Sequence, residues 1–306
     1  MGSPPIFSDV PLSASVIAVP PLARTVDDRI DPVENRKMIR YLEAGGVRTL
    51  LYGGNAVMGQ VAISEYASLL EMLRDSVGAG TRLIPSIGPS YGMMLDQLAP
   101  LRDLGFPTAM VLPTQDPTTP AGLACGIRRV VDRFGRPIVL YLKRDGAVDA
   151  ATVSRMFQDG LICWIKYAIV RERPQEDRFL RALIEGVGNQ VIVSGMGEQP
   201  AIVHWRDYGL AGFTSGCVCI APKRSMQLLD ALRRGDYDDA ERLRAIFAPL
   251  EALRDALSPV RVLHAAVERA GICRTGPIRP LLSPIEEIHI PEIAAAAESL
   301  RRAEPN

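Results

Sequence analysis

The chain has 306 residues, and its 35 lysine and arginine residues balance its 35 aspartate and glutamate residues, which leaves no formal net charge. This balance excludes the strongly basic surface that is typical of proteins binding nucleic acids or anionic membranes. No apolar stretch is long enough to span a bilayer, and no basic region followed by an apolar run opens the sequence, so we expect neither a membrane span nor a secretory signal.

Short apolar segments alternate with longer amphipathic segments along most of the chain. The apolar segments cover residues 15–19, 47–52, 81–87, 108–112, 137–142, 161–167, 190–193 and 211–215, and their starts lie 21 to 34 residues apart. This spacing fits a strand, a helix and two connections in each unit. Asp31 followed by Pro32, Ser64 and Asp149 each precede an amphipathic segment and are typical of helix starts.

The number and composition of these units predict the fold class. Nearly continuous apolar strands indicate burial on both faces, as in a parallel sheet that is covered by helices. Eight units in succession predict an α/β protein with a closed (β/α)8 TIM barrel, and an open doubly wound sheet is the alternative. We expect residues 1–222 to form the barrel with the catalytic site. Residues 223–306 show helical patterns only and are predicted to form a C-terminal helical extension, with a last helix at residues 291–302.

Two reactive side chains stand at the carboxyl ends of neighbouring predicted strands. Tyr141 ends the fifth and Lys166 the sixth, 25 residues or about one βα unit later, so they should lie at similar heights. A lysine after the apolar run LICWI is costly to bury charged, which favours the neutral amine that attacks carbonyl groups. The tyrosine hydroxyl could relay protons. The alternative is a solvated lysine beside a core tyrosine.

Several motifs resemble one known family. These are the tyrosine in PIVLY, the lysine in WIK, VSGMGE, GLAGFTSG and GPIRPLL. From about Ala14 to its end, the chain resembles the dihydrodipicolinate synthase/N-acetylneuraminate lyase family of class I aldolases. The resemblance implies that Lys166 forms a Schiff base with a 2-oxo acid such as pyruvate, and that Tyr141 relays protons. It further implies that no metal or organic cofactor is needed, and that the protein is a homo-oligomer, a tetramer or dimer.

Gly53, Gly54 and Asn55 follow the second predicted strand. Glycines let backbone amides approach an anion closely, so these residues are candidates for binding the carboxylate of the 2-oxo acid. A plain turn is the alternative. The family usually has a Gly-Thr-Thr-Gly-Glu run here, and this chain has neither threonine. Residues 113–117 likewise lack the tyrosine pair of true dihydrodipicolinate synthases, which does not favour a site shared between subunits.

Arg144 and Glu198 are further candidates for substrate binding. Arg144, shortly after Tyr141, could grip a second carboxylate or be a surface arginine. Glu198 matches an acidic position that lines the acceptor side in sugar-acid lyases. We favour instead a place at the start of the seventh helix, where the helix dipole would stabilise its charge.

Metal sites and disulfides find little support. Five cysteines form no CxxC motif, and an odd number argues against a disulfide framework. The three histidines share no close spacing with them, so we expect no metal site, and Cys217 and Cys219 are expected to pack. A reducing, cytoplasmic location is the prediction.

Three functional hypotheses follow. In the first, a class I aldolase or lyase joins pyruvate or another 2-oxo acid to an aldehyde, or performs the reverse cleavage. In the second, the same imine serves to dehydrate a deoxy-sugar acid. In the third, the chain is a non-catalytic barrel that binds a small acid, although a binder would need neither Tyr141 nor Lys166.

Overall fold

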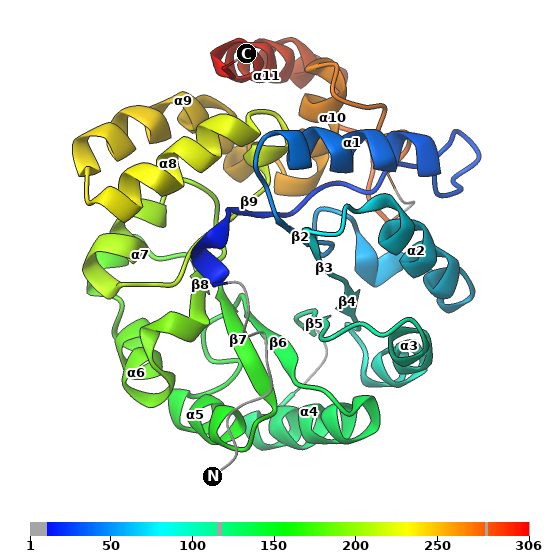
Figure 1. Cartoon of the computed structure of the whole chain (residues 1–306), viewed down its shortest axis with the longest axis vertical. Coiled ribbons are helices and arrows are strands. Elements are labelled where there is room, and N and C mark those ends of the chain that lie inside the picture. Colours follow the sequence, from blue (N-terminus) through cyan, green and yellow to red (C-terminus); the bar gives the residue numbers. More distant parts are fainter. Residues whose placement is uncertain (1–10, 115–117, 279–280, 306) are drawn as a thin grey trace.

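The computed structural model describes residues 11–114, 118–278 and 281–305. Part of the segment in which the tyrosine pair was sought, residues 115–117, lies outside these ranges. The strands form a ring at the centre of the molecule, and the helices surround it (Figure 1). In chain order, the strands are β1 (Ile17–Ala18), β2 (Thr49–Leu51), β3 (Arg82–Ile84), β4 (Ser86–Ile87), β5 (Met110–Val111), β6 (Ile138–Leu142), β7 (Ile162–Tyr167), β8 (Ile192–Ser194) and β9 (Thr214–Ser215).

The strands form two parallel sheets that adjoin at both ends. Their orders are β3-β2-β1-β9 and β4-β5-β6-β7-β8. Pro85 separates β3 from β4 and has no N–H to donate, which accounts for the break in the third predicted strand. At the other end, Ser194 of β8 pairs with Phe213, immediately before β9, in an isolated parallel bridge. The strands therefore follow the circular order of a (β/α)8 barrel, as predicted.

The helices alternate with the strands. They are α1 (Pro32–Ala44), α2 (Ile63–Ser76), α3 (Tyr91–Asp103), α4 (Pro120–Phe134), α5 (Ala150–Gln158), α6 (Arg178–Val187), α7 (Ala201–Tyr208), α8 (Pro222–Arg234), α9 (Tyr237–Ala256), α10 (Pro259–Arg269) and α11 (Ile290–Ala303). Short 3-10 helices are η1 (Leu12–Ala14), η2 (Met58–Gln60), η3 (Pro174–Glu176), η4 (Asn189–Val191), η5 (Cys217–Cys219) and η6 (Glu287–His289).

Helix starts agree with two of the three predicted caps. The Asp31 carboxylate accepts hydrogen bonds from the amides of Val33 and Glu34, and the Asp149 carboxylate accepts one from Thr152. Such bonds satisfy amides that have no partner within the helix. The prediction for Ser64 was wrong, because α2 begins at Ile63 and no side chain caps it.

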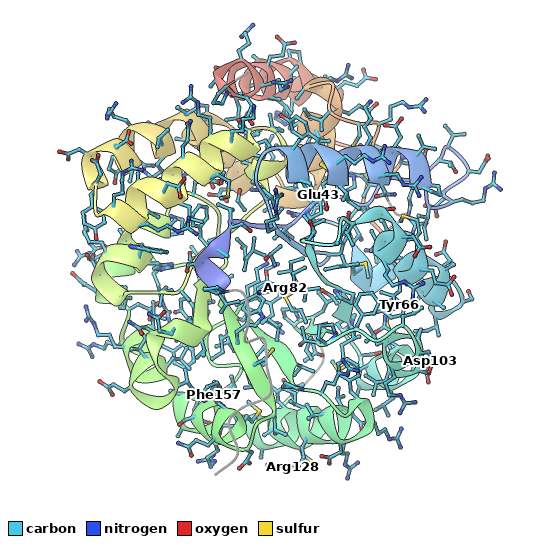
Figure 2. The ribbon with its side chains drawn as sticks, in the orientation of Figure 1. Glu43, Tyr66, Arg82, Asp103, Arg128 and Phe157 are labelled. Carbon is cyan, nitrogen blue, oxygen red and sulfur yellow. The ribbon has the colours of Figure 1, made fainter. Side chains whose placement is uncertain are left out.

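Side chains fill the ring of strands, so the barrel is a packed core and not a pore. Figure 2 shows Arg82, from β3, within the ring, whereas Asp103 and Arg128 lie on the outer helices. The largest fully buried side chains include Trp164 and Tyr167 of β7. Because β7 is buried on both faces, folding removes Lys166 of this strand from water, and this removal costs free energy when the lysine is charged.

The C-terminal helices pack on one another and on the barrel. Helix α9 contacts α7, α8, α10 and α11, and in Figure 1 α8 lies beside α7 in the ring while α11 lies outside it. A helical C-terminal segment is therefore present, and the division at residue 222 stays a prediction. In the part of the chain that the structure describes, no helix combines the length and apolar character needed to cross a membrane.

Candidate active site

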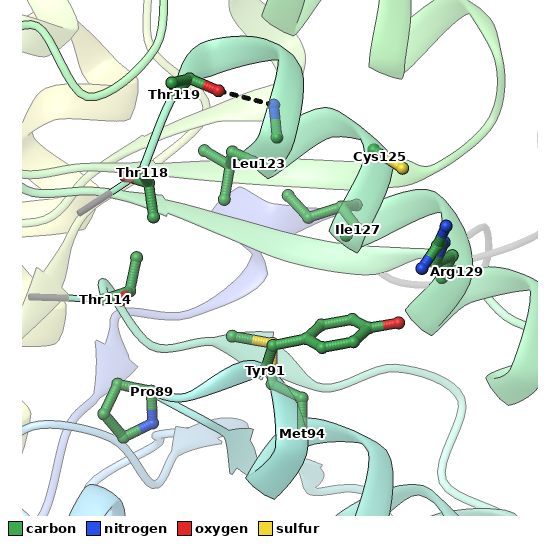
Figure 3. Close-up of a pocket in the computed structure, with 12 residues that line it drawn as sticks. Pro89, Tyr91, Met94, Thr114, Thr118, Thr119, Leu123, Cys125, Ile127 and Arg129 are labelled. Carbon is green, nitrogen blue, oxygen red and sulfur yellow. Dashed lines mark hydrogen bonds between the residues drawn. The ribbon is translucent and has the colours of Figure 1, made fainter. Parts of the chain in front are cut away.

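Two cavities of similar size differ in what lines them. One, of about 600 Å³ between α3 and α4, is lined mainly by apolar and threonine side chains, and Figure 3 shows Tyr91 extended within it toward Arg129. The other, of about 700 Å³, is lined by Lys166, Tyr141 and further charged residues. Since functional cavities combine an apolar wall with a few convergent polar and titratable groups, the second is the candidate active site.

Tyr141 and Lys166 are direct register partners on the neighbouring strands β6 and β7. The Lys166 ammonium nitrogen lies 4.4 Å from the centroid of the Tyr141 ring. The lysine side chain is only 4 % exposed, although it lines the cavity. The strand spacing in the sequence thus predicted their proximity correctly, and the pair meets at one wall of the cavity.

Burial changes the acid–base properties of both groups. Desolvation, followed by the positive charges of Lys143 and Arg254, lowers the pKa of Lys166 from 10.5 to about 7. Desolvation raises the pKa of Tyr141 to about 12. The amine is therefore partly neutral, and so nucleophilic, near neutral pH, while the phenol keeps its proton throughout that range.

Gly195, after β8, makes room for the lysine stem. A Cβ at this position would lie 3.0 Å from Lys166 Cγ and 2.8 Å from the Tyr167 carbonyl oxygen. A side chain at residue 195 would therefore have to displace the lysine or the backbone of β7. This contact gives a physical reason for the first glycine of the GMGE motif.

The predicted carboxylate-binding turn lies at the same cavity. Gly54 and Asn55 line it, whereas Gly53 packs instead against Met110 and Ser86, whose atoms would meet a Cβ at residue 53. Among the described residues, the amides of Gly54 and Asn55 donate to no backbone carbonyl. Two backbone donors are thus available near Lys166, which suits an anion.

Arg144 lies on the loop after β6, outside the cavity lining. Its side chain is exposed, and its guanidinium donates to the carbonyl oxygen of Thr114. Its neighbour Lys143 lines the cavity instead. A role for Arg144 in gripping a second carboxylate stays a prediction, and in this structure its guanidinium is engaged with the backbone.

Glu198 is not a helix cap, which corrects the interpretation favoured from the sequence. Helix α7 begins at Ala201 without a side-chain cap. The Glu198 side chain is fully buried, accepts a hydrogen bond from Ser225 Oγ at 2.7 Å, and does not line the cavity. Its amide donates to Glu251 Oε1 at 2.7 Å, so Gly197, with φ of +88°, turns the chain onto this second glutamate.

Glu198, Cys217 and Glu251 bring ligand-type atoms within 4.8 Å of one another and are the described residues that could hold a metal. Burial, and next the charge of Glu198, raises the pKa of Glu251 well above its usual range. Burial also raises the pKa of the Cys217 thiol well above 9. A carboxyl group and a thiol whose pKa values are both raised, beside the Arg254 guanidinium, are a poor donor set for a cation. All five cysteines are free.

Sequence reasoning missed several residues that line the cavity. These are Lys143, Arg171, His204, Glu251 and Arg254. Arg171 is held by ion pairs to Asp145 and Asp177. His204 accepts or donates a bond with Ser194 Oγ at 2.8 Å, and burial lowers its pKa to about 4. They come from loops and helices, and only the folded chain shows that their side chains reach the same cavity as Lys166.

The pH dependence of amine reactivity follows from these charges. Below about pH 7 Lys166 is protonated and unreactive, so we expect the rate of its reaction with a carbonyl compound to rise through about pH 7 and then level off. Lys143→Gln removes a positive charge that lowers the lysine pKa, so the profile should move to higher pH. Reductive trapping rates across the neutral range measure this, with the exposed Arg128→Gln as control. An identical profile in Lys143→Gln would contradict the assigned cause.

A parallel (β/α)8 barrel with a buried lysine and a tyrosine at the carboxyl ends of adjacent strands has the architecture of a barrel enzyme, in which catalytic groups lie at those ends. A model described as Dihydrodipicolinate synthetase family matches residues 15–300 of this chain. The chain therefore belongs to the dihydrodipicolinate synthetase family, as its motifs predicted.

Named relatives are distant in sequence but match over nearly the whole chain. A 4-hydroxy-tetrahydrodipicolinate synthase of Methanosarcina barkeri is 24 % identical over 88 % of this chain and 92 % of its own length. A probable 5-dehydro-4-deoxyglucarate dehydratase of Rhizobium meliloti is 21 % identical over 89 % and 90 %. Family membership and such relatives support an enzyme of the lyase or dehydratase type.

Solved structures share the fold. The chloride-inhibited dihydrodipicolinate synthase of Acinetobacter baumannii complexed with pyruvate has a TM-score of 0.83 to this chain, at 19 % identity, and the match covers 94 % of this chain and 98 % of that one. At this identity the likeness establishes the barrel, and the chemistry must be argued from the residues.

Proposed function

We propose that this protein is a class I aldolase or lyase in which Lys166 forms a Schiff base with pyruvate or another 2-oxo acid. One observation carries the proposal: a lysine that is 4 % exposed, without an ion-pair partner among the described residues, lies beside Tyr141 at the wall of a cavity. A structural lysine would be expected to have a carboxylate partner or to extend into solvent.

The proposed reaction begins with attack of the neutral Lys166 amine on the C2 carbonyl carbon. Tyr141 passes a proton to the resulting oxyanion, and loss of water from the carbinolamine gives a protonated imine. The Tyr141 phenolate left by the first proton transfer takes a proton from C3, and the imine nitrogen accepts the electron pair of the broken C–H bond. The enamine so formed attacks an aldehyde carbon, and Tyr141 gives the proton to the alkoxide that results. Hydrolysis of the new imine by water releases the product, regenerates the amine and returns a proton to Tyr141.

Charge in the cavity suits an acid. Its lining includes Lys143, Lys166 and Arg254, and the Arg171 charge is offset by its two aspartates. Of the acidic lining residues Glu251 and Asp255, burial raises the pKa of Glu251 well above its usual range, which favours its neutral form. The amides of Gly54 and Asn55, which donate to no backbone carbonyl in the part of the chain that the structure describes, add donors after β2. An anionic substrate would therefore be drawn to this cavity and could place its carbonyl group near the amine.

A second candidate is dehydration of a deoxy-sugar acid through the same imine. This candidate is supported by the Rhizobium meliloti relative, which is named a probable 5-dehydro-4-deoxyglucarate dehydratase. The two reactions share imine formation and differ in the bond that the enamine makes or breaks. Product analysis with aldehydes plus pyruvate, and with deoxy-sugar acids, distinguishes them.

Borohydride trapping tests imine formation directly. Incubation of the full chain with pyruvate and borohydride should add the mass of one reduced pyruvate, and peptide mapping should place it on Lys166. An adduct elsewhere, or no adduct with any 2-oxo acid, would refute both imine reactions and favour a non-catalytic acid-binding barrel. The homo-oligomer expected from the family resemblance is a separate prediction, measured by light scattering.

A further inference from the structure

Gly216 lies where three parts of the chain meet at the cavity. A Cβ at this residue would lie 2.8 Å from Arg254 Nη2 and 3.0 Å from Asn55 Nδ2. Residues 54, 55, 216 and 254 all line the same cavity as Lys166. The absence of a side chain at residue 216 thus lets a guanidinium from α9 and an amide from the loop after β2 converge on one point.

The Arg254 guanidinium contacts protein groups through Nε and Nη1, while its Nη2 lies beside Gly216 at the cavity. Its Nε donates to the Pro259 carbonyl oxygen at 3.2 Å, and its Nη1 lies 3.7 Å from Cys217 Sγ. Among the described residues, no carboxylate lies within ion-pair distance of it. A fixed arginine without a carboxylate partner is the arrangement expected of a group that binds an external anion.

Among the described residues, the nearest acidic groups, Glu251 and Glu198, form no ion pair with this arginine, although their charges raise its pKa. Glu251 Oε1 accepts a hydrogen bond from the Glu198 amide at 2.7 Å, and Glu198 Oε1 accepts one from Ser225 Oγ at 2.7 Å, so the bonds of both carboxyl groups go to partners other than the arginine. Burial, and next the charge of Glu198, raises the pKa of Glu251 well above its usual range, which favours the neutral form of Glu251. The positive charge of Arg254 therefore remains available to the cavity.

The Asn55 side-chain amide also lies beside Gly216, and some of its hydrogen-bonding groups already have partners. Its Nδ2 donates to the Val19 carbonyl oxygen at 2.7 Å, and its backbone carbonyl oxygen lies 2.9 Å from His264 Nε2. These two bonds fix the residue and leave one amide hydrogen and the backbone N–H. A carboxylate next to Asn55 would need a further strong donor, which Arg254 Nη2 supplies.

We propose that Arg254 binds the carboxylate of the 2-oxo acid, together with Asn55 and the amide of Gly54, across the gap left by Gly216. The proposal rests on imine formation at Lys166 and adds the residue that selects acids over neutral ketones. The carboxylate would lie against the guanidinium on one side and the amide donors on the other. The adjoining C2 carbonyl group would then face the lysine.

The test compares a charged and a neutral ketone in the trapping reaction. Pyruvate carries the carboxylate, and hydroxyacetone offers a similar carbonyl group without it. Loss of the Arg254 charge also raises the pKa of Lys166 and so affects trapping of both ketones, which makes the ratio of their half-saturating concentrations the readout. In Arg254→Met, the pyruvate concentration that gives half-maximal trapping should rise about 10- to 100-fold relative to that for hydroxyacetone, the range for losing a charged hydrogen bond. Arg254→Lys keeps the charge without the planar guanidinium, so its half-saturating pyruvate concentration should lie between those of the wild type and Arg254→Met.

Gly216→Ala provides a second variant with an intact backbone. Residue 216 has φ of −90° and ψ of −38°, which any residue adopts, and the atoms it would meet are the ends of two flexible side chains. The variant should fold, and the pyruvate concentration that gives half-maximal trapping should rise by up to about tenfold. Gly80→Ala, where a Cβ meets nothing within 4 Å, is the matched control, and Arg128→Gln controls for a lost surface charge.

Each outcome separates this proposal from the one it rests on. Unchanged half-saturation by pyruvate in Arg254→Met, or an equal loss for both ketones, would overturn the role of Arg254 and leave imine formation intact. Failure of the wild-type protein to form any adduct would overturn imine formation, and the carboxylate role with it. A rise for pyruvate that exceeds the change for hydroxyacetone, in both Arg254→Met and Gly216→Ala, supports the proposal.

Discussion

Lys166→Met is expected to abolish trapping of pyruvate and to lower turnover by on the order of 10⁴-fold or more, because it removes the amine that is proposed to form the imine. Methionine keeps most of the volume of the buried stem, which packs against Gly195. Loss of activity should therefore occur without loss of structure. Intact mass after borohydride treatment, with circular dichroism for the fold, measures both.

The same variant should be more stable than the wild type at neutral pH. Burial lowers the pKa of Lys166 from 10.5 to about 7, so below about pH 7 the charge is buried on folding and its full cost is present. Between about 7 and 10.5 the unfolded state binds more protons than the native state, and wild-type stability rises with pH. Methionine carries no such cost, so we expect a gain of a few kcal/mol below pH 7.

Denaturant unfolding at several pH values checks this sign. The difference between Lys166→Met and wild type should be largest at and below about pH 7 and should shrink as the pH approaches 10.5. Lys37→Met, at an exposed position of α1, is the control and should show no comparable pH dependence. A buried lysine whose removal destabilises the protein equally at all pH values would instead be a structural residue.

The barrel could be predicted because its signals are local and repeated. Each β-strand was an apolar run at regular spacing, and caps such as Asp31 and Asp149 mark helix starts that the structure retains. The break at Pro85 was visible in principle, since a proline cannot donate to a neighbouring strand. The bridge between Ser194 and Phe213 joins the consecutive strands β8 and β9, and no local signal in the sequence shows that they meet in an isolated bridge.

The site was predictable only where strand order determines it. Tyr141 and Lys166 end adjacent strands, so spacing alone paired them. Arg254 comes from α9, and the side of α9 that faces the cavity is set by packing against the barrel, which no local pattern records. Glu198 was misplaced for a related reason: its partner Glu251 is 53 residues away, and only the folded chain shows the pairing.

Tyr141→Phe tests the remaining member of the pair and should separate proton transfer from imine chemistry. The phenyl ring still lies under the Lys166 nitrogen, so fold and lysine position should be kept, and only the hydroxyl is lost. That hydroxyl holds its proton at neutral pH, since burial raises the pKa of Tyr141 to about 12, and it can therefore give and recover a proton within one cycle. We expect turnover to fall by about 10²- to 10⁴-fold. Borohydride should still trap pyruvate on Lys166, more slowly.

Tyr91→Phe, in the other cavity, is the matched control for a lost phenol. If the turnover of Tyr141→Phe equals that of this control, the Tyr141 hydroxyl has no role in the reaction.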